Sequence, residues 1–422
     1  MKVAVVGGGS TYTPELVDGL ARLRDRIDVT ELALVDPAAE RVSVVGGLAR
    51  RMFARHGHPA TVSWGDNLEA AVEGASIVLI QLRVGGQAAR RTDETFPLEE
   101  CCLGQETTGA GGLAKALRTV PVVLDIAERV RRVAPDAWIL DFTNPVGIQT
   151  RALLDAGHRA VGLCNVAITT QRWTAAALDV SPSEVELDHF GLNHLSWVWA
   201  LRVHGQDRLS DILGNDGLTY GLTGLDARHS RRIGALPSPY LRYYYDHDNI
   251  VEGLKTSETR ADQVAKLEQE LLALYADPSL DTKPEILNQR GGAFYSEAAV
   301  ELMAALLAPA SPGAVSRQVL NVRNRGTLPF LDDDAVIEVP CVVDQAGARP
   351  LPARRVDPLA AGLIAHVSGY ETLAVDAALR GGRDRVVRAL LAHPLIGQAD
   401  LSERLADKLI AINTQYLPWA RA

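Results

Sequence analysis

The chain has 422 residues, a formal net charge of −9 and 47% hydrophobic residues. This length is sufficient for two domains with a sizeable core, and the acidic excess argues against binding to nucleic acid or to an anionic membrane. Four cysteines are too few for a disulfide scaffold, no apolar run approaches 18 residues, and the N-terminus lacks the pattern of a signal peptide. These features predict a soluble, cytoplasmic enzyme.

The first 165 residues alternate between strand-like and helix-like segments. Short apolar runs, rich in β-branched residues, are followed by longer segments whose apolar residues have helical spacing. This alternation is typical of an α/β fold, a Rossmann-like doubly wound parallel sheet with helices on both faces. The expected strands are residues 2–6, 32–35, 77–82, 138–142 and 160–163, and the expected helices are 15–23, 38–56, 115–133 and 145–154.

The alternation weakens after residue 165. The sequence predicts a nucleotide-binding domain over 1–165, followed by a mixed α+β domain over 166–422 that packs directly on it, because no long linker separates them. In the second domain the expected strands are 185–187, 195–203 and 336–339, and the expected helices are 261–275, 359–379 and 385–392.

A glycine-rich turn follows the first expected strand. Gly7-Gly8-Gly9-Ser10-Thr11-Tyr12 leads into a helix, which lets the backbone approach a pyrophosphate at the helix N-terminus. Asp36 ends the second strand, where a carboxylate accepts hydrogen bonds from both ribose hydroxyls and repels a 2′-phosphate. Tyr12 occupies the position of the third glycine of the dinucleotide motif. The prediction is an NAD site formed by Gly7, Gly9, Ser10, Thr11 and Asp36; the alternative is a structural turn with a surface Asp-Pro corner.

Three further polar residues follow other expected strands. Arg83, Asn144 and Cys164 each stand at a strand end, and the carboxyl ends of parallel strands line one crevice. Arg83 suits an anionic or polyhydroxyl ligand and is also assigned to the cofactor site. A helix cap is the alternative role for Asn144.

Cys164 and His194 form a candidate metal site. A thiolate and an imidazole together suit a divalent metal that keeps open positions for substrate. A buried small hydrophobic residue is the alternative reading of Cys164, and His189 is a competing ligand.

Together these segments resemble glycoside hydrolase family 4, the NAD- and metal-dependent glycosidases. Cys164-Asn165-Val166 is similar to the 6-phospho-β-glucosidase branch, whose Cys-Asn-Val-Pro pattern the chain leaves at Ala167. Asn165 also replaces the aspartate that α-specific relatives offer as an acid. The resemblance covers nearly the whole chain and rests on residues 7–16, 104–109 (Gly-Gln-Glu-Thr-Thr-Gly), 141–147, 164–166, 191–194, 376–379 and 393–395.

The resemblance implies a redox-assisted elimination in place of the two-carboxylate mechanism of ordinary glycosidases. NAD⁺ takes hydride from sugar carbon 3, a divalent metal, expected to be Mn²⁺, polarises the ketone, and a base removes the proton at carbon 2. The aglycone then leaves from carbon 1, water adds, and hydride returns. The implied base is Tyr240, with Tyr243 and Tyr244 as alternatives, and the implied metal ligands are Cys164 and His194 together with sugar oxygens and water.

The resemblance also implies a phosphorylated glycoside as the partner and a homodimer or homotetramer whose C-terminal domain supplies substrate contacts and the subunit interface. Substrate contacts are assigned to Arg83, Asn144, Asn165 and Arg260. Alternatives are an unphosphorylated, galacto or α-linked glycoside, a plain NAD-dependent dehydrogenase, and a catalytically silent sensor. Arg260 is the first choice for the phosphate among six arginines: Arg83, Arg91, Arg231, Arg232, Arg242 and Arg260.

Overall fold

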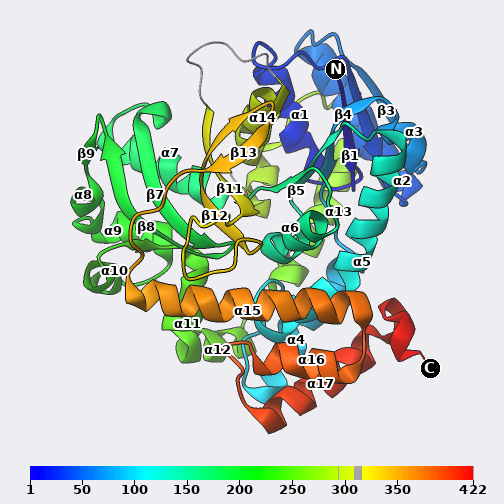
Figure 1. Cartoon of the computed structure of the whole chain (residues 1–422). Helices are drawn as coiled ribbons and strands as arrows, with labels where there is room; N and C mark the ends of the chain where they lie inside the picture. Colours follow the sequence, from blue (N-terminus) through cyan, green and yellow to red (C-terminus); the bar gives the residue numbers. More distant parts are fainter. Residues whose placement is uncertain (293, 308–315, 422) are drawn as a thin grey trace.

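The computed structural model describes residues 1–292, 294–307 and 316–421. Its strands join into one sheet with the order β10-β8-β7-β12-β11-β6-β5-β4-β1-β2-β3, while β13 pairs with β12 and β9 with β8. The half from β6 to β3 is parallel and the other half is antiparallel. In Figure 1 the parallel half lies around the blue strands and the antiparallel half around the green and yellow ones.

The parallel half has the strand order 3-2-1-4-5-6 of doubly wound nucleotide-binding folds, which confirms the predicted α/β class. The five expected strands are present, and a sixth was not expected. That strand, β3, has no fully buried residue, so its sequence lacks the apolar run that identifies a buried strand. The strands are β1 (Lys2–Val6), β2 (Glu31–Val35), β3 (Thr61–Gly65), β4 (Ala75–Ile80), β5 (Trp138–Asp141) and β6 (Ala160–Gly162).

Helices cover both faces of this half. Val3 and Val5 pack with α1 and α2, whereas Ala4 and Val6 pack with α3 and α5 on the opposite face, as the alternation of side chains along a strand requires. The helices are α1 (Thr13–Arg22), α2 (Ala39–Arg55), α3 (Leu68–Val72), α4 (Gly86–Thr95), α5 (Gly109–Val133) and α6 (Val146–Asp155).

Helix α5 begins six residues before the predicted start. Its first turn contains three glycines, which have low intrinsic helix propensity, so the sequence pattern did not indicate a helix there. Tertiary packing explains them, because a Cβ at Gly111 would lie 2.3 Å from the Asp93 carbonyl oxygen. The close approach brings the start of α5 against α4, next to the site described below.

The antiparallel half continues the same sheet, since Asn321 of β11 pairs with Gly162 of β6. The expected strands at 185–187 and 336–339 are longer than predicted. The strands are β7 (Val185–Leu192), β8 (Leu195–Val203), β9 (Gln206–Asp207), β10 (Leu236–Pro237), β11 (Ser316–Arg323), β12 (Val336–Asp344) and β13 (Gly347–Pro350).

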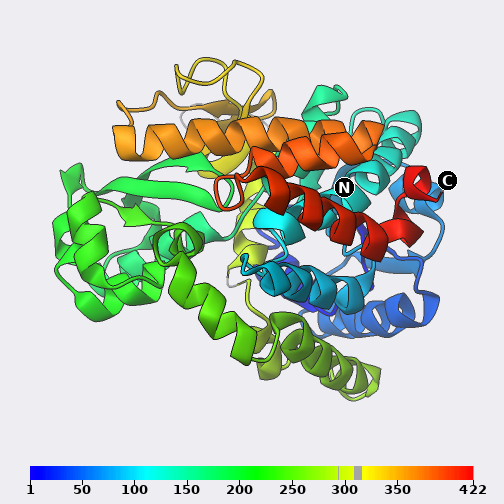
Figure 2. The same ribbon diagram turned by 90° about the horizontal axis from the view of Figure 1, so that it is seen from below.

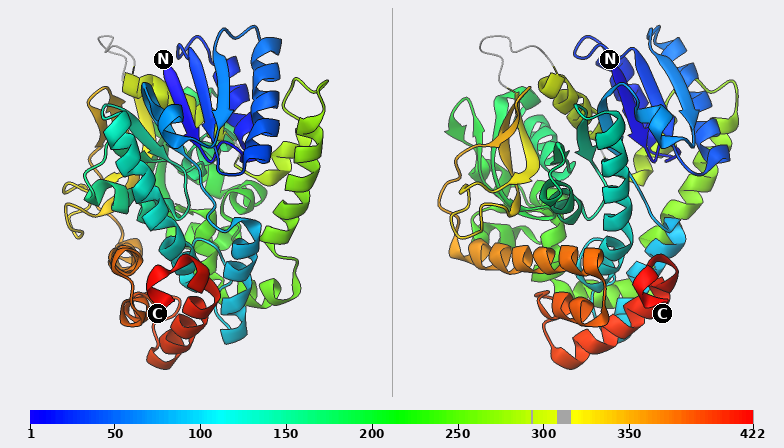
Figure 3. Two further views of the ribbon diagram at one scale, coloured as in Figure 1. Left: turned by 90° about the vertical axis from the view of Figure 1, so that its right-hand side faces the viewer. Right: turned by 45° about the vertical axis from the view of Figure 1, so that its right-hand side comes forward.

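Most of the remaining helices surround this half and one end of the molecule, whereas α13 packs on α2 and α4, and α14 on α1, of the parallel half. Helices α15–α17 stack together at that end, beside the C-terminus (Figures 2 and 3). Among the described residues, no helix has the length and apolar character needed to cross a membrane. The helices are α7 (Val166–Leu178), α8 (Leu209–Leu213), α9 (Asp216–Thr223), α10 (Ala227–Ile233), α11 (Arg242–Tyr245), α12 (His247–Thr256), α13 (Arg260–Ala276), α14 (Tyr295–Leu307), α15 (Pro358–Arg380), α16 (Arg383–Leu391) and α17 (Ala399–Asn413).

Candidate functional site

A cleft of about 1350 Å³ lies at the carboxyl ends of the parallel strands. Its walls also include the turn η3 (Pro239–Leu241), the start of α13 and residues 290–292. Two of the predicted site residues, Gly9 and Thr11, are buried behind this surface. The other predicted residues all line the cleft: Gly7, Ser10, Asp36, Arg83, Asn144, Cys164, Asn165, His194, Tyr240 and Arg260.

The glycine turn is fastened to the second strand. The Gly7 and Gly8 amides donate to the Val35 carbonyl at 2.9 and 3.0 Å, and a Cβ at Gly7 would lie 2.4 Å from the Gln81 carbonyl oxygen. The Asp36 carboxylate accepts the Gly9 amide at 3.1 Å and the Ala38 amide at 2.9 Å. This arrangement anchors a carboxylate beside a backbone cradle that side chains would fill, and it fits a dinucleotide with free ribose hydroxyls.

Two residues of the turn have roles that the sequence did not indicate. Thr11 is fully buried, its carbonyl accepts the Tyr275 hydroxyl at 2.7 Å, and it supports the turn from behind. Tyr12, in the position of the third glycine, lines the cleft and donates its hydroxyl to the Gly292 carbonyl. Its ring packs edge-on against Tyr295 with centroids 5.3 Å apart. The missing glycine is therefore replaced by a side chain that ties the turn to the opposite wall.

Cys164 follows β6, and His194 lies in the tight turn between β7 and β8. His194 has a φ of +63°, so the turn holds its backbone in the left-handed region. Burial lowers the pKa of His194 to about 4, which leaves the ring neutral with a nitrogen lone pair free for a metal. Burial raises the pKa of the Cys164 thiol to about 12, so metal binding would displace its proton.

The donor set fits a metal that shares its coordination with substrate. Among the described residues, no cluster of three or more His, Cys, Asp or Glu side chains is placed to hold an ion. A metal at Cys164 and His194 would therefore take its remaining ligands from substrate or water, as the sequence predicted.

His189, the competing ligand, serves a structural purpose. Its Nε2 lies 2.9 Å from Oε1 of the buried Glu338, and it is not among the residues that line the cleft. Glu338 also accepts the side-chain amide of Asn193 at 3.0 Å and the Ser196 hydroxyl at 3.2 Å. These bonds fix both ends of the turn that presents His194.

Three neighbouring tyrosines were candidates for the base, and their positions differ. The Tyr240 ring stacks on the His194 ring with centroids 3.5 Å apart and planes inclined by 5°. Tyr243 lines the cleft and accepts a hydrogen bond from Arg242, whereas Tyr244 borders a separate small cavity with His393. Burial raises the pKa of Tyr240 above its usual range, so a cation close to the phenol is required for it to act as a base at neutral pH.

Asn144 and Asn165 also line the cleft. The buried Oδ1 of Asn144 has no hydrogen-bond partner among the described residues, and the N-cap residue of α6 is Pro145. The helix-cap alternative for Asn144 is therefore not observed, and its amide is available to a ligand. Ala167, where the chain leaves the pattern of the β-specific branch, is buried in the first turn of α7 and is not among the lining residues.

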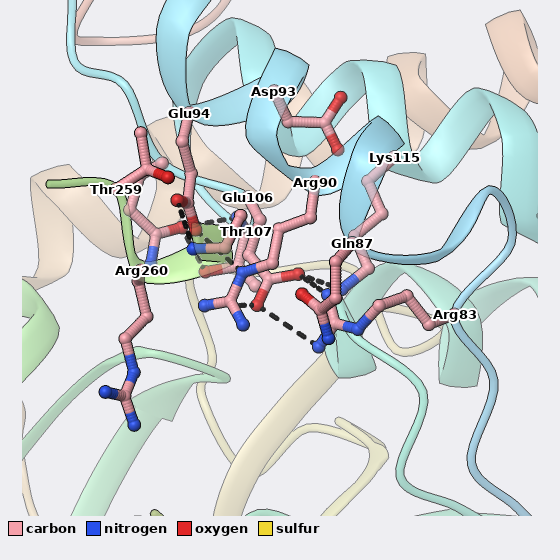
Figure 4. A network of polar contacts seen from close by, with 12 residues as sticks. Arg83, Gln87, Arg90, Asp93, Glu94, Glu106, Thr107, Lys115, Thr259 and Arg260 are labelled. Carbon is pink, nitrogen blue, oxygen red and sulfur yellow. Dashed lines mark hydrogen bonds and ion pairs between the residues drawn. The ribbon is translucent and has the colours of Figure 1, made fainter. Parts of the chain in front are cut away.

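A buried network of charges supports the floor of the cleft, and sequence reasoning missed it (Figure 4). Glu106 is contacted by Arg83, by Arg90 at 3.0 Å and by Lys115 at 2.6 Å. Burial opposes ionisation of Glu106, but the three cations hold its pKa well below the usual range. The only signal for this network was the segment Gly-Gln-Glu-Thr-Thr-Gly at 104–109, to which no role was assigned.

The arginines differ in their partners. Arg260 lines the cleft, donates to the Gln263 side chain at 3.0 Å and to the Gln289 carbonyl at 2.8 Å, and forms no ion pair with a carboxylate in the described part of the chain. Figure 4 shows its guanidinium projecting away from the Glu106 cluster. Arg242 also lines the cleft without such a pair. Of the other candidates, Arg83 is held by Glu106, while Arg91, Arg231 and Arg232 are not among the lining residues.

The fold and the site together define an α/β protein in which one cleft is lined by the nucleotide turn, a cysteine–histidine donor pair and a partly buried tyrosine. Residues 2–180 match the model of the family 4 glycosyl hydrolases, and residues 189–396 match the model of the C-terminal domain of that family. The chain therefore belongs to glycoside hydrolase family 4, and it is a glycosidase.

Relatives match the chain over nearly its full length. It is 34% identical to a probable 6-phospho-β-glucosidase of Bacillus subtilis, covering 99% of this chain and 97% of the relative. The identity to the 6-phospho-β-glucosidase of Escherichia coli is also 34%, covering 99% and 96%. The solved structure of the Thermotoga maritima 6-phospho-β-glucosidase with NAD and glucose-6-phosphate has a TM-score of 0.92 at 33% identity, covering 99% of each chain.

With an NAD-dependent dehydrogenase, the alternative considered above, the comparison shows a similar fold and nothing more. Malate dehydrogenase from Salinibacter ruber has a TM-score of 0.54 at 18% identity, covering 91% of this chain and 99% of the enzyme.

Proposed function

We propose that this glycosidase hydrolyses 6-phospho-β-glucosides and uses NAD and a divalent metal, Mn²⁺, as cofactors. The observation that carries the proposal is the stacking of Tyr240 on His194 in a cleft that Cys164 and the nucleotide turn also line. A structure of the Thermotoga maritima relative contains manganese, NAD⁺ and glucose-6-phosphate. The β-linkage is supported by identity, since the β-specific relatives reach 33–34% and a phospho-α-glucosidase of Clostridium acetobutylicum reaches 29%.

Each cleft residue has its own proposed role in binding or catalysis, according to its position. When bound, NAD⁺ would accept and return a hydride, and the metal would polarise the sugar oxygens that it coordinates. Asp36 would accept hydrogen bonds from the ribose hydroxyls, and Cys164 and His194 would hold the metal. Asn144 would bind a sugar hydroxyl through its unpartnered carbonyl oxygen. Tyr240 would take the proton from sugar carbon 2 on its phenol oxygen, next to the His194 ring.

Arg260 is the proposed phosphate ligand. A phosphate dianion needs a cation whose charge is not already neutralised, and bidentate guanidinium contacts match its oxygens. Arg83 and Arg90 are paired with Glu106, and Arg290 with Glu268 at 2.9 Å, whereas the partners of Arg260 within the described residues are all neutral oxygens.

Four broader expectations accompany this proposal. Residues 1–165 would bind the dinucleotide, and residues 166–422 would supply substrate contacts and the subunit interface. The enzyme would act in the cytoplasm as a homodimer or homotetramer, without nucleic-acid or membrane partners. The acidic net charge supports the absence of such anionic partners.

The test is nitrophenol release from 4-nitrophenyl β-glucoside 6-phosphate by metal-stripped enzyme under reducing conditions, with and without NAD⁺ and Mn²⁺. Release is expected only when both are added, with no net accumulation of NADH. Reaction of the unphosphorylated or α-linked analogue in place of this substrate would overturn the proposed specificity. NADH accumulation without release would overturn the mechanism and favour a dehydrogenase.

A further inference from the structure

The loop between β4 and α4 forms part of the cleft wall next to the glycine turn. Its residues 83–86 (Arg-Val-Gly-Gly) line the cleft one after another. The chain just before them contacts the turn, since a Cβ on Gly7 would lie 2.4 Å from the Gln81 carbonyl oxygen. A dinucleotide bound at the glycine turn would therefore meet loop 83–86.

The two ends of this loop are held in different ways. At the first end, the Arg83 guanidinium forms an ion pair with Glu106. At the second end, Gly85 and Gly86 have φ angles of +84° and +62°, and glycine backbone has more conformational freedom than that of any other residue. A Cβ on Gly86 would have no neighbour from the rest of the described chain within 4 Å. The second end therefore depends on the contact that Gly85 makes.

Tyr416 makes this contact from the C-terminal segment. It lies in the 3₁₀ turn η5 (Thr414–Tyr416), which follows α17. A Cβ on Gly85 would lie 2.8 Å from the Tyr416 hydroxyl oxygen and 3.1 Å from its Cζ, so the ring packs directly on the glycine backbone. Tyr416 is not among the residues that line the cleft, whereas Gly85 is. The tyrosine therefore supports the cleft wall from behind.

A buried network fixes the position of this ring. The Arg118 guanidinium lies over the Tyr416 ring, 5.7 Å from its centre. Arg118 donates to both carboxylate oxygens of Asp93, at 2.9 and 2.6 Å, and to Oδ1 of Asn413 at 2.6 Å. All three partners of this network are buried, and they come from α5, α4 and α17. In Figure 4 the Asp93 carboxylate points away from Glu106, so this network is separate from the one on the cleft floor.

We propose that Tyr416 is a positioning residue for the cofactor site, and that its contact with Gly85 keeps loop 83–86 in the arrangement that a dinucleotide on the glycine turn contacts. The inference rests on the proposed function, which assigns NAD as a cofactor. Without the ring, the glycine backbone has to be ordered when the dinucleotide binds, and this entropic cost lowers the affinity. The C-terminal segment thus supports NAD⁺ binding without touching the cofactor.

The test measures NAD⁺ affinity of the full-length enzyme by titration calorimetry. Tyr416→Ala should weaken NAD⁺ binding about five- to thirty-fold, which corresponds to ordering one backbone residue on binding. In the absence of NAD⁺, amide hydrogen exchange over residues 83–89 should be faster in this variant than in wild type. Tyr416→Phe keeps the ring and should restore both properties. A loss of affinity in Tyr416→Phe equal to that in Tyr416→Ala would overturn the packing role.

Trp419→Ala provides the matched control. Trp419 lies in the next turn, η6 (Pro418–Ala420), and packs in the same way on Gly381, where a Cβ would lie 2.5 Å from Cδ1 of the indole. Gly381 has a φ of +64° but is not among the residues that line the cleft. Both variants therefore remove an aromatic ring from a glycine, and only Tyr416→Ala should change the NAD⁺ affinity and the exchange of loop 83–86. An equal loss of affinity in both would indicate general loosening of the C-terminal segment and overturn the proposal.

Tyr416→Leu keeps the test decisive if Tyr416→Ala does not fold. The leucine side chain ends before the Cζ and hydroxyl positions that contact Gly85, so the same loss of affinity is expected, and unchanged affinity would refute the inference. NAD⁺ binding by a wild-type enzyme that cleaves no glycoside would refute the proposed function alone, because the affinities of the variants still decide the role of Tyr416. Equal NAD⁺ affinity of wild type and Tyr416→Ala, in an enzyme that cleaves the phosphorylated glycoside, would refute the inference alone.

Discussion

Glu106→Gln tests the buried charge network most directly. The substitution keeps the shape of the side chain and removes the negative charge that Arg83, Arg90 and Lys115 share. The Glu106 and Lys115 side chains are 7% and 3% exposed, so water does little to replace the lost partner. Breaking a buried ion pair by removing one member costs about 3–5 kcal/mol, because it leaves a buried charge without compensation.

The expected thermal shift follows from the size of the chain. Unfolding entropy near the midpoint is about 2.1 cal/mol/K per residue, which for 422 residues is roughly 0.9 kcal/mol/K. The midpoint of Glu106→Gln should therefore fall by about 3–6 °C in differential scanning calorimetry. Glu100→Gln is the control, since the Glu100 carboxylate contacts Lys408 at 2.8 Å and Arg404 at 2.9 Å on the surface, where ion pairs contribute little.

The pH dependence provides a second check. Burial lowers the pKa of Lys115 to about 8, even with Glu106 beside it. Without Glu106 this pKa falls further, and deprotonation of Lys115 relieves part of the cost. The difference in midpoint between wild type and Glu106→Gln should therefore be larger at pH 6 than at pH 9. A shift no larger than that of Glu100→Gln, at either pH, would refute the reasoning.

Three further substitutions test separate parts of the site. Tyr240→Phe should lower kcat about 10²- to 10⁴-fold, as loss of a general base does, with unchanged calorimetric affinity for NAD⁺; a loss below about ten-fold would exclude Tyr240 as the base. Asp36→Ala should weaken NAD⁺ binding about 10- to 100-fold, the effect of losing hydrogen bonds to a charged acceptor, and unchanged affinity in calorimetry would place the ribose elsewhere. Burial raises the pKa of Asp141 to about 8, so the native carboxyl is protonated at pH 6. In the unfolded chain this carboxyl ionises near pH 4. The stability that the protonated native carboxyl contributes is therefore lost as the pH rises from about 4 through 8. Asp141→Asn cannot ionise, so its thermal midpoint relative to wild type should rise between pH 6 and pH 9, and a constant difference would contradict this assignment.

Local sequence patterns were sufficient to predict most strands and helices of the parallel half of the sheet. Buried strands such as β1 and β4 consist of apolar runs, and the period of the apolar residues identifies the helices between them. The start of α5 and the edge strand β3 were missed because their signals are not local: glycines at 109–112 form a helix only against α4, and β3 is only partly buried.

The candidate site was found in the same way, because ligands bind at the carboxyl ends of parallel strands and chain order alone identifies the residues that stand there. This reasoning located Asp36, Asn144 and Cys164 from the residues themselves. The residue types also made His194 a candidate metal ligand with Cys164, beside the competing His189, whereas the role of Tyr240 came from the resemblance to the family alone. The structure added that the rings of His194 and Tyr240 stack, a contact between a hairpin turn and a 3₁₀ turn 46 positions later that no local pattern contains.

The sequence by itself therefore determined most of the alternation of strands and helices in the parallel half, the polar residues at the strand ends and the family. Only the tertiary structure decided which charges neutralise one another. Arg83 forms an ion pair with Glu106 and Arg290 with Glu268, whereas Arg260 forms none with a carboxylate of the described residues. It also decided that the antiparallel strands extend the parallel sheet and that Tyr416 packs on Gly85 of the cleft wall. The physical reason is the sequence separation of the interacting residues. A helix or strand pattern can be recognised within a few consecutive residues, whereas the pairing of buried charges depends on which distant segments meet in the fold.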